Sequence, residues 1–244
     1  MKPRRMLFRH CVVAAMALTG ARWVTAAVDV AHAERRIAAR VDAVRRAEGL
    51  APLSSDAALA AAARGFAEHM ARTDRYGHEA DGRRPGERAR AAGYAWCMVA
   101  ENIAWQSRSD GFAGDALSER FVDGWLRSPR HRRNLLAPEA TQAAVAIARS
   151  AASGRYYAVH LFGRPASLRQ SFEIENRSGR ALRYTLGSRS LALPAGTVRR
   201  HTQCEQPSLR IEALPTALQP SAGERVVIES SRGGGLRVRR HESG

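Results

Sequence analysis

The segments Ala100-Glu101-Asn102-Ile103-Ala104 and Trp125-Leu126-Arg127-Ser128-Pro129-Arg130-His131-Arg132-Arg133-Asn134 decide the interpretation of this chain. They place a carboxylate, amides and an imidazole in two short blocks, and His78 lies upstream of both. A carboxylate and imidazoles that share a pocket bind a metal ion or a polar ligand, or transfer protons. The alternative is that these side chains only hold the fold together.

The first 27 residues have the pattern of a secretory signal. A basic stretch at residues 2–9 precedes a short apolar run at residues 11–21, and small residues as late as Ala33 offer cleavage sites. A membrane anchor is the alternative, but a span needs roughly 20 apolar residues, and Arg22 interrupts the run. We therefore expect cleavage, no transmembrane segment in the mature chain, and a secreted or periplasmic location.

The chain is strongly basic. Its formal charge is +16, and loss of residues 1–27 removes five basic and no acidic residues, which leaves +11. Such a charge attracts anionic envelope polymers or lipid head groups, or it is simply a solvated surface. No basic run alternates with aromatic residues as a nucleic-acid platform requires, so we expect no nucleic-acid partner.

Periodicity predicts helices first and strands later in the first part of the chain. Apolar spacing of three and four residues predicts four helices, and two-residue alternation predicts a hairpin, with a further strand in the mixed segment 94–105. The helices cover residues 33–48, 57–76, 86–92 and 115–128, and the hairpin strands cover residues 143–149 and 155–162. Pro129 is predicted to end the fourth helix.

The pattern changes after Gly163-Arg164-Pro165. Short alternating segments then follow one another, separated by clusters of Gly, Pro, Asn and Ser, and no helical period appears. We therefore predict a signal peptide at residues 1–27, a mixed domain at residues 34–165 and a small all-β domain at residues 168–244.

Five motifs in the mixed domain occur in the order of a known family. They are the loop histidine His78, the R-x-x-x-A-G-Y segment of residues 88–94, the E-N-I-A and W-x-x-S-P-x-H-x-x-N blocks quoted above, and the Y-x-V-x-x-F-G strand of residues 157–163. Over residues 36–163 the chain resembles the bacterial branch of the CAP superfamily, the SCP-like extracellular proteins named after cysteine-rich secretory protein, antigen 5 and pathogenesis-related 1. The resemblance implies an α+β fold, a CAP-type α-β-α sandwich with a central antiparallel sheet, and a secreted or surface location.

The resemblance also implies a cavity. Its lining would include His78, Glu101, His131, Asn102 and Ser128. The residues at the first three of these positions bind a divalent metal in some members of the family. Animal-type members carry a glutamate where this chain has Ser128, so the four-residue metal set is incomplete. No cofactor is certain, but His78, Glu101 and His131 would be the three zinc ligands of an open site.

Two cysteines remain after signal cleavage, Cys97 and Cys204. In an oxidising compartment they can pair and connect the two domains. The alternative is a pair of free, buried thiols.

Two function classes follow from these observations. The first, which we favour, is a monomeric, non-enzymatic binding module for a lipid, a cell-envelope component or a protein partner. The second is a divalent-metal-dependent hydrolase, such as a peptidase, that uses the same cavity to polarise a water molecule. Neither a nucleophile elbow nor an H-E-x-x-H motif is present.

Overall fold

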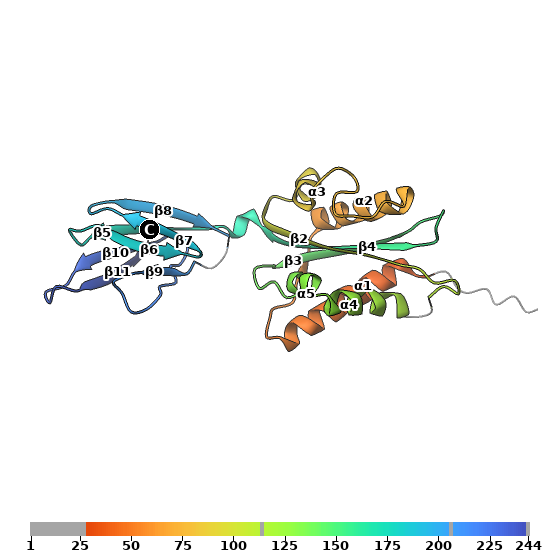
Figure 1. Ribbon diagram of the computed structural model, residues 1–244, viewed down its shortest axis with the longest axis horizontal. Coiled ribbons are helices and arrows are strands. Elements are labelled where there is room, and N and C mark those ends of the chain that lie inside the picture. Colours follow the sequence, from red (N-terminus) through yellow and green to blue (C-terminus); the bar gives the residue numbers. More distant parts are fainter. Residues whose placement is uncertain (1–27, 113–114, 205–206, 243–244) are drawn as a thin grey trace, which may run out of the picture.

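The computed structural model describes residues 28–112, 115–204 and 207–242 (Figure 1). The predicted signal peptide lies outside the described residues. The α+β prediction is confirmed. Up to Pro165 the elements are α1 (Val30–Ala47), β1 (Ser54–Ser55), α2 (Ala57–Thr73), α3 (Pro85–Ala91), β2 (Trp96–Gln106), α4 (Ala116–Arg127), α5 (Pro129–Leu135), β3 (Gln142–Arg149) and β4 (Tyr156–Pro165).

The first part of the chain is a three-layer α-β-α sandwich. Its sheet has the order β1-β3-β4-β2, in which β2 and β3 flank β4 in antiparallel register and the short β1 runs parallel to β3. Helices α2 and α3 cover one face of this sheet, and α1, α4 and α5 cover the other (Figure 1). Strand β2 therefore lies at an edge, between the two helical layers.

The alternation of β4 explains why both faces are covered. Ala158 and Phe162 pack with α1 and α4, whereas Val159 and Leu161 pack with α2. All four side chains are fully buried. A strand that is apolar on both faces must be covered on both sides, and this requirement produces the sandwich.

Local signals set the helix ends. The carboxylates of Asp29 and Asp56 accept backbone N–H groups in the first turns of α1 and α2, as N-cap residues do. Gly49 follows α1 with a φ of +74°. Helix α2 ends at Thr73, three residues earlier than predicted, because Asp74 adopts a left-handed conformation with φ 50°.

The prediction at Pro129 needs a correction. Helix α4 does end before Pro129, but this proline begins a further helix, α5, that the sequence analysis missed. Proline is suited to the first turn of a helix, where its missing N–H would have no partner and its fixed φ is already helical. His131 and Asn134 therefore lie on a helix.

Within the described residues of the C-terminal part, the regular elements are strands, preceded by one short 3-10 turn, η1 (Ala166–Leu168). The strands are β5 (Gln170–Arg177), β6 (Leu182–Leu186), β7 (Arg189–Leu193), β8 (Val198–Gln203), β9 (Leu209–Ile211), β10 (Glu224–Ser230) and β11 (Leu236–Glu242). They form two sheets, β11-β10-β5-β8 and β7-β6-β9. Phe172 and Ile228 of one sheet and Tyr184 and Leu209 of the other belong to one buried cluster, so the sheets pack face to face.

A disulfide joins the two parts of the chain. Cys97 and Cys204 are bonded, with their Cα atoms 5.4 Å apart and a sequence separation of 107. The register of β2 against β4 shifts between Trp96 and Met98, so Cys97 is the extra residue of a β-bulge. The bulge removes this side chain from the regular alternation of the strand. Among the described residues, no helix is both long and apolar enough to span a membrane.

Candidate functional site

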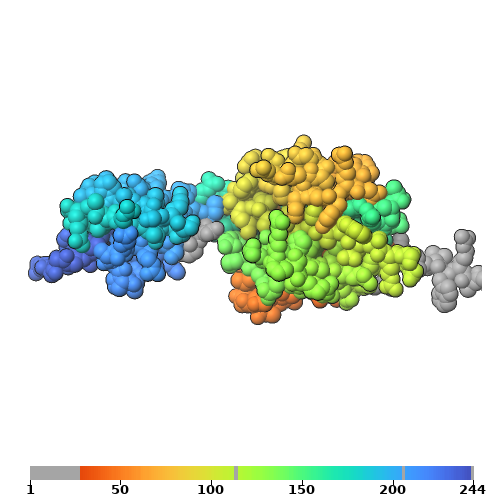
Figure 2. Space-filling model, in the orientation of Figure 1, coloured from red at the N-terminus to blue at the C-terminus, as the bar shows by residue number. Residues whose placement is uncertain are grey.

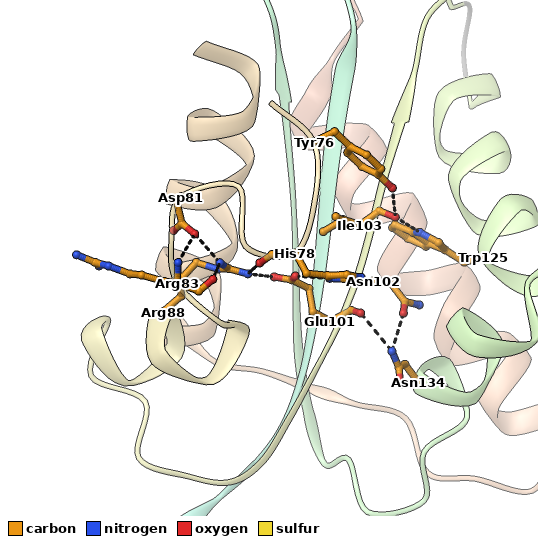
Figure 3. A network of polar contacts seen from close by, with 10 residues as sticks. All are labelled: Tyr76, His78, Asp81, Arg83, Arg88, Glu101, Asn102, Ile103, Trp125 and Asn134. Atoms are coloured by element: carbon orange, nitrogen blue, oxygen red, sulfur yellow. Dashed lines mark hydrogen bonds and ion pairs between the residues drawn. The ribbon is translucent and has the colours of Figure 1, made fainter. Parts of the chain in front are cut away.

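The predicted cavity residues gather around the free edge of β2. Successive residues of a strand point to opposite faces. Glu101 therefore faces the α2–α3 layer, where it meets His78, and Asn102 faces the α4–α5 layer, where it meets α5 (Figure 3). The E-N pair of the E-N-I-A motif thus contacts both helical layers from one strand.

Glu101 is a buried carboxylate with both oxygens engaged. Its Oε1 lies 2.8 Å from His78 Nδ1, and its Oε2 accepts a hydrogen bond from Arg88 Nη2 at 2.7 Å. The side chains of Glu101 and Arg88 are only 1% and 5% exposed. A buried charge is tolerated only when it is paired and hydrogen-bonded, and Arg88 supplies the pairing charge.

Arg88 also positions the loop that carries His78. Its guanidinium donates to Asp81 Oδ1 at 2.8 Å, to the His78 carbonyl at 2.9 Å and to the Arg83 carbonyl at 2.5 Å (Figure 3). It also lies 3.5 Å from the centre of the Phe66 ring, a cation–π contact. One arginine on α3 therefore pairs with the carboxylate and holds the backbone of the loop that carries His78.

On the other face, two asparagines connect β2 to α5. Asn102 Nδ2 donates to the His131 carbonyl at 3.0 Å. Asn134 Nδ2 donates to Asn102 Oδ1 at 2.9 Å and to the Glu101 carbonyl at 3.2 Å. Asn102 is completely buried. These contacts show a structural role for Asn102 and hold α5 against the strand.

Side chains also cover the exposed backbone of β2. The Ile103 carbonyl accepts hydrogen bonds from the Tyr76 hydroxyl at 3.2 Å and from Trp125 Nε1 at 3.3 Å (Figure 3). Burial, followed by the nearby charge of Glu101, raises the pKa of Tyr76. An unpaired carbonyl on an edge strand can form a hydrogen bond with a strand of another chain. The Ile103 carbonyl is instead satisfied by Tyr76 and Trp125.

His131 lies on α5. Its imidazole is half-buried, and burial lowers its pKa, with further lowering by the charges of His78 and Arg130. The His131 carbonyl accepts a hydrogen bond from Asn102, so His131 lies beside β2. Ser128 is half-buried at the junction of α4 and α5, and among the described residues its hydroxyl makes no hydrogen bond to His78, Glu101 or His131.

The donor set does not fit a three-ligand metal site. Among the described residues, no group of three or more His, Cys, Asp or Glu side chains is arranged to hold a metal ion. Glu101 is held by His78 and Arg88, and the adjacent guanidinium charge opposes a second cation. The zinc set of His78, Glu101 and His131 is therefore not assembled here, and we derive no metal-dependent step.

The sequence analysis did not single out Arg88, Asp81, Tyr76 or Asn134 as site residues. Arg88 opens the R-x-x-x-A-G-Y motif and Asn134 closes the W-x-x-S-P-x-H-x-x-N motif, so their positions in these motifs were the available signal. Tyr76 and Asp81 carried no such signal. Their contacts depend on the path of the loop between α2 and α3.

The fold and the site together define an α+β domain of the cysteine-rich secretory type. Residues 38–162 match the sequence model of the CAP family, the cysteine-rich secretory protein family. This match spans just over half of the chain, and the chain belongs to this family. The resemblance inferred from the motifs is confirmed.

One relative among the curated proteins is bacterial. The uncharacterized protein YkwD of Bacillus subtilis (strain 168) is 27% identical over 123 residues, which are 50% of this chain and 45% of that protein. The chain thus matches less than half the length of this relative.

Among solved structures, an outer surface protein from Borrelia burgdorferi has a TM-score of 0.50 and 19% identity, and the match covers 57% of this chain and 96% of that one. An extracellular protein containing a SCP domain from Bacillus anthracis str. Ames has a TM-score of 0.45 and 24% identity, over 54% and 40% of the two chains. The first likeness supports the sandwich fold. The chain is a CAP-domain protein.

Proposed function

We propose that this chain is a secreted or periplasmic binding module without enzymatic activity. It binds a lipid, a cell-envelope component or a partner protein at the cavity lined by His78, Glu101 and His131. The observation that supports this most directly is the state of Glu101, which is buried and held through both oxygens.

A general base needs an oxygen or nitrogen within reach of the proton it takes. Both oxygens of Glu101 are already engaged, and its side chain is only 1% exposed. The two imidazoles remain as groups that can donate to or accept from a polar ligand. His78 contacts Glu101 through Nδ1, which leaves Nε2 for such a contact.

One observation favours the hydrolase alternative. A carboxylate 2.8 Å from an imidazole nitrogen orients that imidazole, as in catalytic triads. A triad also needs a nucleophile hydrogen-bonded to the imidazole, and among the described residues Ser128 makes no such bond. The pair therefore orients a ligand-binding histidine in our account.

The proposed secreted or periplasmic location is supported by the sequence, by a structural relative and by the disulfide. The sequence has the pattern of a signal peptide, and the structural relative from Borrelia burgdorferi is an outer surface protein. A disulfide between Cys97 and Cys204 persists in an oxidising compartment.

The test is extraction of bound molecules from protein secreted by its native host, followed by mass spectrometry. Wild type is compared with His78→Ala and His131→Ala, and with His241→Ala as a control, since His241 is exposed on β11. The proposal predicts a co-purified lipid or envelope fragment that both cavity variants lose and the control keeps. Wild-type protein that carries no such molecule and cleaves casein, with cleavage lost in His131→Ala, would contradict it.

A further inference from the structure

A groove lies beside α5, on the α4–α5 side of the molecule. It has a volume of about 690 Å³ and is bounded by the end of α4, by α5, by the loop that follows α5 and by the start of β2. Figure 2 shows α4 and α5 in yellow-green and green on the exposed face of this part of the chain. The volume lies within the ~300–1,000 Å³ of typical ligand pockets.

The floor of this α5 groove is apolar. Met98, Leu126 and Leu136 line it, and all three are partly buried side chains that pack against the core shared by α1 and α4. A methionine in such a place adapts to different partners because its side chain is unbranched and flexible. The floor is therefore a continuation of the core that reaches the surface.

The rim of the groove carries uncompensated positive charge. Arg127 and Arg133 line the groove and are exposed, and among the described residues neither forms an ion pair. Arg132, between them in sequence, is different because it pairs with Glu48 at 2.6 Å. A guanidinium binds a carboxylate through two parallel hydrogen bonds, so this rim suits a ligand with acidic groups.

The rim also carries one acidic residue. Glu139 lines the groove, and its carboxylate forms no ion pair within the part of the chain that the structure describes. An alkyl tail beside Glu139 would leave this carboxylate without a partner. A peptide can instead offer carboxylates to the arginines, apolar side chains to the floor and an N–H group to Glu139. Methionine and arginine are also enriched in protein–protein interfaces.

We infer that the α5 groove docks an extended segment of a partner protein in which acidic and apolar residues alternate. The inference rests on the proposed binding function and specifies the class of partner that is bound. The α5 groove is separate from the side of β2 on which His78 lies. Asn134 connects the two surfaces, because it lines the groove and also donates to the Glu101 carbonyl. The protein partner therefore binds at α5, next to the cavity.

The experiment uses the mature secreted chain and three fluorescein-labelled, capped octapeptides in an anisotropy titration. The first alternates Asp and Leu, the second alternates Asn and Leu, and the third alternates Lys and Leu. We expect the acidic peptide to bind about tenfold or more tightly than the amide peptide, because hydrogen bonds to charged groups are the stronger ones. The lysine peptide should not bind.

Paired substitutions locate the site. Arg127→Gln with Arg133→Gln should weaken the acidic peptide about tenfold or more, and Leu136→Asp should abolish its binding. The matched control is Arg183→Gln with Arg210→Gln, which removes two exposed arginines from neighbouring strands of the C-terminal part and should change nothing. Circular dichroism checks that each variant is folded.

Several results would overturn the inference. Equal binding of the acidic and amide peptides would do so, as would no binding to wild type or an equal loss in the control pair. If dodecanoate displaces the labelled acidic peptide from wild type more effectively than the unlabelled acidic peptide does, the groove takes a lipid instead of a peptide. If His131→Ala abolishes peptide binding and the groove variants do not, the ligand lies in the cavity, and only the proposed function survives.

Discussion

Arg88→Met should destabilise the CAP domain severely. The substitution keeps an unbranched apolar side chain but removes the guanidinium, which pairs with Glu101 and lies over the Phe66 ring. The pair is almost fully buried, with side chains 5% and 1% exposed. Breaking such a pair from one side costs about 3–5 kcal/mol, because the remaining carboxylate is left buried without its partner.

The assay is urea unfolding followed by tryptophan fluorescence at pH 7. Three of the four tryptophans, residues 96, 105 and 125, lie in the first domain, and the fourth lies in the predicted signal peptide. The signal therefore reports on the domain that contains Arg88. Arg84→Met is the control on the same helical segment, because Arg84 is 78% exposed and its contact with Glu79 is a surface ion pair. Such pairs contribute about 0–1 kcal/mol.

A second measurement separates the ion pair from simple loss of packing. The double variant Arg88→Met with Glu101→Gln removes both charges, and it should recover part of the stability that Arg88→Met alone loses. If Arg88→Met costs no more than Arg84→Met, or if the second substitution only adds to the loss, then Arg88 does not hold Glu101 in the way we describe.

Three further predictions concern the rest of the chain. Burial lowers the pKa of His160 to about 3, so this histidine stays neutral in the folded protein, whereas in the unfolded chain it takes up a proton below about pH 6.5. The free energy of unfolding therefore falls as the pH falls from about 6.5 towards 3. His160→Leu should therefore reduce the loss of unfolding free energy between pH 7 and pH 4 by a few kcal/mol. Urea unfolding at a series of pH values measures this loss, and an unchanged dependence on pH would refute the prediction. Gly86→Ala should destabilise by about 1–3 kcal/mol, because its Cβ would lie 2.7 Å from the half-buried indole of Trp96, whereas Gly65→Ala, with open space around it, should stabilise by about 0.5–1 kcal/mol. Thermal unfolding of both variants gives the comparison, and equal shifts would contradict it. Cys97→Ser with Cys204→Ser opens a loop of 107 residues and should cost up to about 4–5 kcal/mol in the chain-entropy model, seen as faster proteolysis, and unchanged proteolysis would argue against this role.

Much of the fold could be predicted from the sequence, because its main signals are local. The two-residue alternation identified the hairpin strand at residues 155–162, and the apolar spacing identified the helix that begins at residue 57. Helix α5 was missed, since Pro129 is compatible both with a helix end and with a helix start. Only the packing of α5 against β2, through Asn134, distinguishes a helix start at Pro129 from a helix end.

The site was predictable in part. Its motifs identified His78, Glu101, Asn102 and His131, and the structure brings all four to the edge of β2. The role of Glu101 was not predictable, because it depends on the burial of Arg88 beside it. Whether an arginine is solvated or buried is decided by the tertiary fold, and most arginines in this chain are on the surface.

The central claim is that Glu101 is committed to Arg88 and His78 and is therefore not a metal ligand. The most direct test is elemental analysis of the protein isolated from its native host, for wild type and for Glu101→Gln. Our account predicts zinc well below one equivalent per chain in both proteins. One zinc per chain in wild type, lost in Glu101→Gln, would contradict it.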